Sequence, residues 1–246
     1  MRYWVCAYCN NQHKLDEEIK DSLKQTSFYR AMKSENCQGT VVVLDKEGVT
    51  FTRIWCVFEY SQSTGSDNPN FKFDMVTCLD GEGGAVCLMD GTCREDERQD
   101  WKPAAENKQE REQGFPVALL EKGIGFRAED AEATKPEDKV RIIKEIKESG
   151  KTVADLNATV RGMVAAAGAG VVLDDATKLA NFLKAVEDGG APKLAIGPAV
   201  KTQDQVNMFL DAAVPDKLTD LHVGTEAFKG YGLNLLSRFG KLRVLE

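Results

Sequence analysis

The chain has 246 residues, of which 42% are hydrophobic and 29% are charged. This composition is typical of a soluble globular protein and excludes disordered and collagen-like classes. The net charge of −7 would repel nucleic-acid phosphates and anionic lipid, which disfavours both kinds of partner. The seven cysteines all come before residue 94, and an odd number indicates reduced thiols rather than a disulfide framework. The sequence shows neither a signal peptide nor an apolar stretch of membrane-spanning length, so we expect a cytoplasmic protein.

The first part of the chain alternates between strand and helix patterns. Two runs of β-branched or aromatic residues, Tyr3–Tyr8 and Thr40–Leu44, predict strands, and the segment His13–Lys33 between them mixes helix formers with turn residues. Phe51–Tyr60 follows, and its apolar residues fit one buried face of a short helix better than an alternating strand. The sequence therefore predicts strand, helix, strand and helix in this order.

Two short apolar runs follow, Met75–Leu79 and Ala85–Met89, and only a Gly-rich turn separates them. A parallel crossover needs about a dozen residues or more, so the two runs form a hairpin unless one of them lies outside the main sheet. The next segment, Arg94–Glu112, is dominated by charged residues and contains a proline. Such a segment predicts a solvated linker or a frayed helix on the surface.

Three helices are predicted in the second half of the chain. The pattern Thr134-x-x-Glu137, with Pro136 in the first turn, is that of a capping box, and the apolar spacing after it predicts a helix that runs to Lys147. Val153–Ala167 and Asp175–Glu187 each have apolar residues three or four positions apart and a Gly-rich end, which predicts two more helices.

The pair Lys-Leu recurs at a constant interval, at 193–194, 217–218 and 241–242. Its middle copy continues as Leu218-x-x-Leu221-x-Val223, which is the spacing by which a leucine-rich repeat directs a short strand into a stacked core. The last copy is cut short at Glu246. Such repeats stack into a solenoid with an extended concave binding face.

The motif Cys6-x-x-Cys9 followed by His13 has residue types that bind zinc or perform redox chemistry. Cys6 lies in a predicted strand, however, where the odd spacing to Cys9 directs the two thiols to opposite faces. No second Cys or His pair follows at finger spacing, so we expect no metal site. The second histidine of the chain, His222, likewise has no spaced Ser or Cys partner that would indicate a hydrolase triad.

The strand at Thr40–Leu44 and the motif Trp55-Cys56-x-x-Glu59 after it resemble the third strand and following helix of Toll/interleukin-1 receptor (TIR) domains. Together with the segment Trp4–Gln12, this block resembles uncharacterised multidomain proteins of unicellular eukaryotes that continue into leucine-rich repeats. Those proteins carry one more strand before the segment that matches Trp4–Gln12. The resemblance therefore implies that this chain lacks its first strand and is truncated at both ends.

In TIR domains that cleave NAD, the glutamate of this motif handles the nicotinamide ribose. The resemblance thus implies that Glu59 is a candidate catalytic carboxylate, but the loop that helps to form the nucleotide pocket in those domains is missing here. Asn10 and Asn11, at the end of the first predicted strand, and Arg53 are candidate pocket groups. NAD would then be a substrate, and no cofactor is implied. The alternative interpretation is that Glu59 is a surface residue at a helix end, paired with Arg53, and that the two asparagines belong to a turn.

Taken together, these patterns predict an α/β fold in three parts. Residues 1–125 form a TIR-like, flavodoxin-like open sheet without its first strand, residues 126–190 a helical connector, and residues 191–246 a truncated leucine-rich-repeat segment. We expect a protein-interaction or signalling scaffold that binds protein partners through the repeat face and self-associates. The alternatives are an NAD nucleosidase that uses Glu59, and a non-functional fragment whose open sheet edge favours aggregation.

Overall fold

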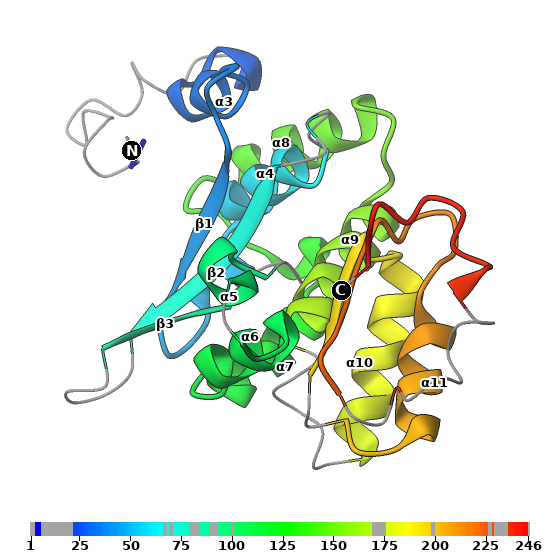
Figure 1. Ribbon diagram of the computed structural model, residues 1–246. Coiled ribbons are helices and arrows are strands. Elements are labelled where there is room, and N and C mark those ends of the chain that lie inside the picture. The colour runs from blue at the N-terminus through cyan, green and yellow to red at the C-terminus, as the bar shows by residue number, and fades with distance from the viewer. Residues whose placement is uncertain are drawn as a thin grey trace.

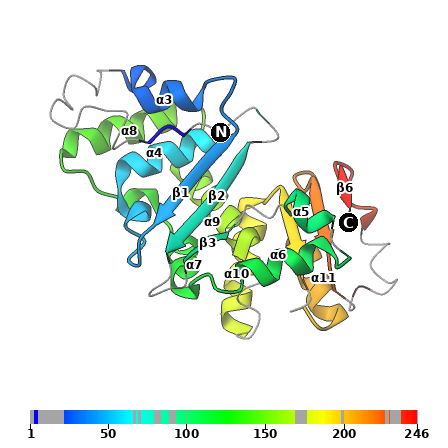
Figure 2. The ribbon, with the colours of Figure 1, turned by 60° about the vertical axis from the view of Figure 1, so that its left-hand side comes forward.

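A computed structural model describes residues 3–5, 22–65, 68, 71–78, 84–88, 93–99, 101–168, 176–197, 200–225, 228 and 236–245. These residues form two three-stranded sheets, and helix α9 (Val153–Gly168) lies between the sheets in both views (Figures 1 and 2). Buried apolar side chains of both sheets and of the helices between them form one continuous cluster from Leu23 to Phe239. The mixed α/β class is therefore confirmed, whereas the TIR-like arrangement, the leucine-rich-repeat solenoid and the predicted boundaries after residues 125 and 190 stay predictions.

The first sheet has the strand order β1-β2-β3. Its strands are β1 (Gly39–Leu44), β2 (Lys72–Cys78) and β3 (Ala85–Leu88). β1 and β2 are parallel, with Val42 opposite Met75, and β2 and β3 are antiparallel. This confirms the predicted strand at Thr40–Leu44 and the predicted hairpin between the next two apolar runs.

The connection from β1 to β2 contains the 3-10 helix η2 (Val49–Thr52) and helix α4 (Ile54–Ser63). α4 confirms the helix predicted within Phe51–Tyr60. Four of its apolar side chains are almost fully buried: Ile54, Val57, Phe58 and Tyr60. The short helix therefore forms because the main core receives nearly all of its apolar surface.

The amino-terminal elements of the described chain are the 3-10 helix η1 (Leu23–Gln25) and helix α3 (Ser27–Met32). Phe28 of α3 packs edge-on against two aromatic rings of α4. The predicted strand at Tyr3–Tyr8 is wrong over Tyr3–Val5, which belong to no strand, and its other residues lie outside the described ones. Tyr3 is largely exposed, so the burial that would stabilise an apolar strand is missing there.

The last four described helices before the second sheet run from residue 117 to residue 189. They are α7 (Val117–Ile124), α8 (Pro136–Glu148), α9 and α10 (Ala176–Gly189), with the 3-10 helix η4 (Ala128–Asp130) between α7 and α8. All three helices predicted in this part are confirmed. The predicted capping box is wrong, because the residue before α8 is Lys135 and its side chain makes no capping hydrogen bond. Pro136 lies in the first turn of α8, as predicted, since its fixed φ suits the first helical position.

The second sheet is parallel, with the order β4-β5-β6. Its strands are β4 (Lys193–Ile196), β5 (Asp220–Val223) and β6 (Val244–Leu245), and α11 (Gln203–Ala212) lies between the first two.

The structure corrects the predicted repeat register in this sheet. The Lys-Leu repeat makes Leu218 the counterpart of Leu194. Instead, Leu194 lies opposite Leu221, and Leu221 lies opposite Leu245, so the first interval along the chain is longer than the second. Leu218 lies before the start of β5. The next residue, Thr219, donates its main-chain N–H to the carbonyl of Pro192, directly before β4.

The segment Arg94–Glu112 is not a solvated linker, and this prediction was wrong. It contains α5 (Glu95–Arg98) and α6 (Ala104–Glu112), and α6 packs against both β3 and β5. Three of its charged side chains, Glu97, Lys108 and Glu112, are buried. The physical reason is that these charges are paired with other charges inside the fold, which a count of charges along the sequence does not show.

None of the described helices is long and apolar enough to cross a membrane.

Candidate functional site

Glu59 lies in the middle of α4 with a half-buried side chain. Burial raises its pKa to about 7, and the charge of Arg53 opposes this only weakly. Within the described part of the chain, its carboxylate has neither an ion pair nor a hydrogen bond. Near neutral pH this carboxyl is therefore a mixture of its acid and its ionised form.

Arg53 is exposed at the residue before α4. Its main chain forms an isolated bridge with Glu132, in which Ile54 donates to the carbonyl of Glu132 at 2.9 Å and Glu132 donates to the carbonyl of Thr52 at 2.8 Å. This bridge fixes the start of α4.

The surface interpretation of Glu59 placed it at a helix end, whereas α4 continues beyond it to Ser63.

The other predicted pocket groups, Asn10 and Asn11, lie outside the described residues, as do Cys6, Cys9 and His13. Of the predicted site residues, the structure thus describes only Glu59 and Arg53. The two are close in sequence, since Arg53 directly precedes α4 and Glu59 lies within it. Among the residues that the structure describes, no three His, Cys, Asp or Glu side chains gather as metal ligands.

The aromatic residues around Glu59 have structural contacts. The indole nitrogen Nε1 of Trp55 donates to Oδ2 of Asp138 on α8 at 3.2 Å, and the guanidinium of Arg141 lies over the Trp55 ring. Phe58 and Tyr60 are buried in the core. These contacts join α4 to α8 and leave none of the three rings free to stack on a nucleotide base.

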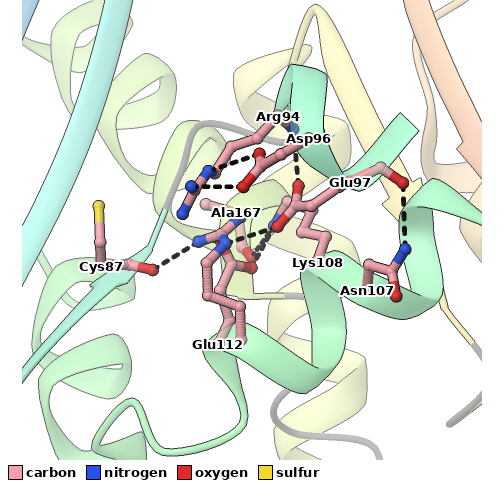
Figure 3. Close-up of polar contacts among 9 residues, drawn as sticks. Cys87, Arg94, Asp96, Glu97, Asn107, Lys108, Glu112 and Ala167 are labelled. Atoms are coloured by element: carbon pink, nitrogen blue, oxygen red, sulfur yellow. Dashed lines mark hydrogen bonds and ion pairs between the residues drawn. The ribbon is translucent and has the colours of Figure 1, made fainter. Parts of the chain in front are cut away.

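Sequence reasoning missed a buried group of charges on α5 and α6 (Figure 3). We call Glu97, Lys108, Arg111 and Glu112 the α6 charge cluster. Lys108 pairs with Glu112, and these side chains are only 4% and 3% exposed. Nζ of Lys108 also donates to the carbonyl of Ala167, near the end of α9. That carbonyl belongs to the negative end of the α9 dipole, which favours a cation there.

Within the α6 charge cluster, Arg111 connects Glu97 of α5 to Glu112 of α6. It donates to Oε1 of Glu97 at 2.6 Å, to Oε1 of Glu112 at 3.0 Å and to the carbonyl of Cys87 on β3 at 2.9 Å. Burial by itself would lower the pKa of Arg111, but the hydrogen bond to Glu97 and the charge of Glu112 more than compensate and raise it. The guanidinium therefore stays charged and holds α5, α6 and β3 together.

Cys87 is not a nucleophile in this arrangement. Burial raises the pKa of its thiol, and the charge of Asp74 raises it further. A protonated thiol is a poor nucleophile and a poor metal ligand. The α6 charge cluster therefore has no described group beside it that it could activate.

α6 also covers part of the second sheet (Figure 2). Ala195 of β4 packs in a small buried cluster with Cys93 and Ala105, on the strand face opposite to Leu194. A Cβ at Gly224, directly after β5, would lie 3.0 Å from the Ala105 Cβ and from the Glu106 nitrogen. α6 thus lies close against the strand face that the repeat pattern predicted to be the partner surface.

One sequence signal could have indicated this contact. Gly197 directly follows β4 and Gly224 directly follows β5, and the last residues of the two strands lie opposite one another. A Cβ at Gly197 would lie 2.2 Å from Oε1 of Gln109 and 3.2 Å from the carbonyl of Ala105. Two glycines at one repeat position therefore mark where another segment approaches the backbone.

Comparisons with protein-family models, with curated proteins and with solved structures find no match for this chain.

Proposed function

We propose that this protein is an interaction module that binds a protein partner through the outer face of its first sheet. The observation that carries the proposal is the exposure of Val41 and Val43 on β1, at 51% and 64%. Their neighbours in the strand, Val42 and Leu44, are buried. β1 therefore presents apolar side chains on both faces, as a strand does when both of its faces are meant to be covered.

The position of β1 in the sheet adds to this proposal. β1 stands at one edge of the first sheet, and within the described chain it pairs only with β2. Val41 lies opposite Asp74 and Val43 opposite Val76, so the outer face continues onto β2. A strand edge that pairs with no other described strand and carries an apolar face suits a partner that adds a strand or lies across the sheet.

The repeat face was the expected partner surface, and the geometry favours the first sheet over it. α6 of the same chain already lies against the face of β4 and β5 that carries Ala195, Gly197 and Gly224. A partner that binds to that face would have to displace α6, whereas a partner on the outer face of β1 would not. The proposal therefore keeps the expected scaffold function and assigns its partner, or a second copy of the chain, to the outer face of β1.

The experiment compares the wild type with Val41→Asp/Val43→Asp. Both chains are tagged and used to capture proteins from their own cells, and sedimentation velocity measures self-association. We expect the double variant to lose at least one captured protein, or a self-association, that the wild type retains. The matched control is Val49→Asp/Met208→Asp, which changes two other exposed apolar residues. Equal capture and equal self-association by all three chains would contradict the proposal.

A second candidate function is NAD cleavage, and one observation favours it. The half-buried Glu59 carboxyl, whose pKa burial raises to about 7, is the kind of perturbed acid that is enriched in active sites. In its ionised form it would stabilise the positive charge that develops on the ribose when nicotinamide leaves. The resemblance of the motif Trp55-Cys56-x-x-Glu59 to TIR domains supports the same assignment.

Chromatographic detection of nicotinamide released from NAD tests this second candidate. We expect release by the wild type to increase as the pH rises through about 7, because the ionised carboxylate is the active form. Glu59→Gln should abolish the release, while Glu47→Gln, a change on the nearby surface, should not. No release by the wild type at any pH would reject NAD cleavage by this chain and leave the interaction module unaffected.

A further inference from the structure

A groove runs along α8 to the start of α9, and its lining includes neither Glu59, nor the α6 charge cluster, nor Val41 and Val43 of β1. Two adjoining hollows of about 620 Å³ each form it, and they share Lys139, Ile143 and Lys147. These three residues are four positions apart and thus lie in one row along the helix. We call this surface the α8 groove.

Part of the lining of the α8 groove is apolar. Half-buried Ile143 lines both hollows, Val140, which is 71% exposed, lines one of them, and half-buried Val153 of α9 lines the other. Gly150 allows this arrangement, because its φ of +83° is favourable only for glycine and lets the chain turn between the two helices. Its missing side chain also keeps the groove open, since a Cβ there would meet no atom within 4 Å.

Lysines also line the α8 groove. Lys139 donates to the main-chain carbonyl of Glu129 at 2.6 Å. Neither Lys139 nor Lys147 nor Lys151 has a carboxylate within 4.0 Å in the described part of the chain, whereas Lys144 is paired with Glu148 at 3.6 Å. Three positive charges thus face the α8 groove without a carboxylate in direct contact.

The acidic residues at the α8 groove do not supply the missing carboxylates. The carboxylate of Glu129 accepts a hydrogen bond from Nδ2 of Asn157 at 2.8 Å, and this bond lowers its pKa. Burial and the charge of Lys33 lower the pKa of Lys151, and the charge of Asp155 offsets this only in part. The negative charge of an incoming anion would, like that of Asp155, favour the charged form of Lys151.

We propose that the α8 groove binds an acidic peptide segment of a partner protein, with an apolar side chain of that segment seated over Val140 and Ile143. The carboxylates of the peptide would pair with Lys139 and Lys147 on either side of the apolar residue. This chemistry differs from that of the outer face of β1, which has no lysine row. The inference thus assigns a second interaction surface with its own class of partner.

A peptide fits the α8 groove better than a membrane or a nucleic acid does. The net charge of −7 opposes approach to an extended polyanion, whether a nucleic acid or an anionic lipid surface, more than it opposes approach of a short peptide. A peptide brings a few carboxylates and one apolar group at side-chain spacing. The binding energy would come from the apolar contact, and the lysines would select the acidic sequence.

The test is a selection from a random peptide library against the full-length chain, followed by fluorescence anisotropy with the most enriched peptide. We expect enriched sequences with Asp or Glu on both sides of Leu, Ile, Phe or Met. Lys139→Glu/Lys147→Glu should weaken binding about tenfold or more, because two attractions become repulsions. Val140→Asp should weaken it several-fold, and added salt should weaken binding to the wild type.

The matched control is Lys201→Glu/Lys241→Glu, which makes the same charge change at two exposed lysines away from the α8 groove. The affinity of this control for the peptide should stay within about twofold of the wild-type affinity, because its two lysines do not line the α8 groove. Circular dichroism melting verifies that every variant folds, and Val140→Asp keeps the test valid if the double lysine variant does not. The proposal is overturned by a selection without an acidic and apolar motif, or by binding that the groove variants leave unchanged. Groove-dependent binding to phosphatidylserine vesicles, without binding to the peptide, would also overturn it.

Discussion

α4 and α6 are two short helices that each carry an acid inside the protein, and they solve the problem of burial in opposite ways. On α4, Glu59 is half-buried without a hydrogen bond or ion pair to its carboxylate in the described chain, and its pKa rises to about 7. On α6, Glu112 is buried more deeply but is paired with Lys108 and Arg111. The contrast teaches that partners, more than depth, decide whether a buried carboxyl is a structural or a chemically available group.

The largest effect is expected from breaking the α6 charge cluster on one side only. Lys108→Met should lower the free energy of unfolding by about 3–5 kcal/mol, because it leaves Glu112 as a buried carboxylate with fewer partners. Urea unfolding measures this change. The double variant Lys108→Met/Glu112→Leu should recover much of the loss, since no unpaired charge remains at this pair.

The matched control for this prediction is the exposed pair Lys144 and Glu148, which has the same spacing along a helix. Lys144→Met should change the free energy of unfolding by no more than about 0.5 kcal/mol. If Lys108→Met were as mild as Lys144→Met, the contrast between the paired acid on α6 and the unpaired acid on α4 would lose its energetic basis.

The second effect concerns Glu59 and depends on pH. Its pKa is raised on folding from 4.5 to about 7, so the folded state binds more protons than the unfolded state between these values. The free energy of unfolding of the wild type should therefore fall as the pH rises from about 4.5 to about 7, by at most ~3 kcal/mol, and less where solvent reaches the side chain. Glu59→Gln should remove this decrease.

Urea unfolding at several pH values checks the Glu59 prediction. Glu59→Gln is expected to be more stable than the wild type near pH 8 and similar to it near pH 4, since glutamine does not ionise. Parallel stability profiles of the two proteins would mean that Glu59 is solvated and that the proposed contrast with Glu112 does not hold.

A smaller effect is expected where α6 meets the second sheet. Gly224→Ala would place a Cβ at 3.0 Å from the Ala105 Cβ and the Glu106 nitrogen, so α6 or β5 must shift. We expect a loss of about 1–2 kcal/mol in the free energy of unfolding. Gly240→Ala is the control, because a Cβ there would meet no atom within 4 Å. Equal melting temperatures of the two variants would indicate that α6 does not press on the second sheet.

The smallest effect belongs to the contact between α4 and α8. Trp55→Phe removes the hydrogen bond from Nε1 to Oδ2 of Asp138 but keeps an aromatic ring against Phe28. The loss should be about 1 kcal/mol, measured by thermal unfolding. A loss several times larger would mean that the Trp55 indole does more for α4 than this one hydrogen bond, and would weaken the argument that Glu59 is the chemically distinctive residue of α4.

Elements whose apolar residues repeat at a regular spacing were predictable. β1, the hairpin of β2 and β3, α4 and the three helices α8, α9 and α10 all follow local periodicity, because each buries one face or stripe in the common core. At the start of α8, Pro136 in the first turn is confirmed, whereas the capping box is wrong, because the residue before the helix is Lys135 and its side chain makes no capping hydrogen bond. Of the candidate site, the sequence placed Glu59 on a short helix, but its burial and raised pKa depend on packing.

The sequence by itself determined the α/β class, the order of most elements and the parallel stacking tendency of the last strands, because these follow from local hydrophobic spacing. Only the tertiary structure decided that residues 94–112 are folded, that Leu194 of β4 lies opposite Leu221 of β5, and that α6 covers the face of these strands. A charged residue becomes compatible with the interior only through its partners, and some of these are distant in sequence. For Lys108, one such partner is the carbonyl of Ala167, 59 residues away.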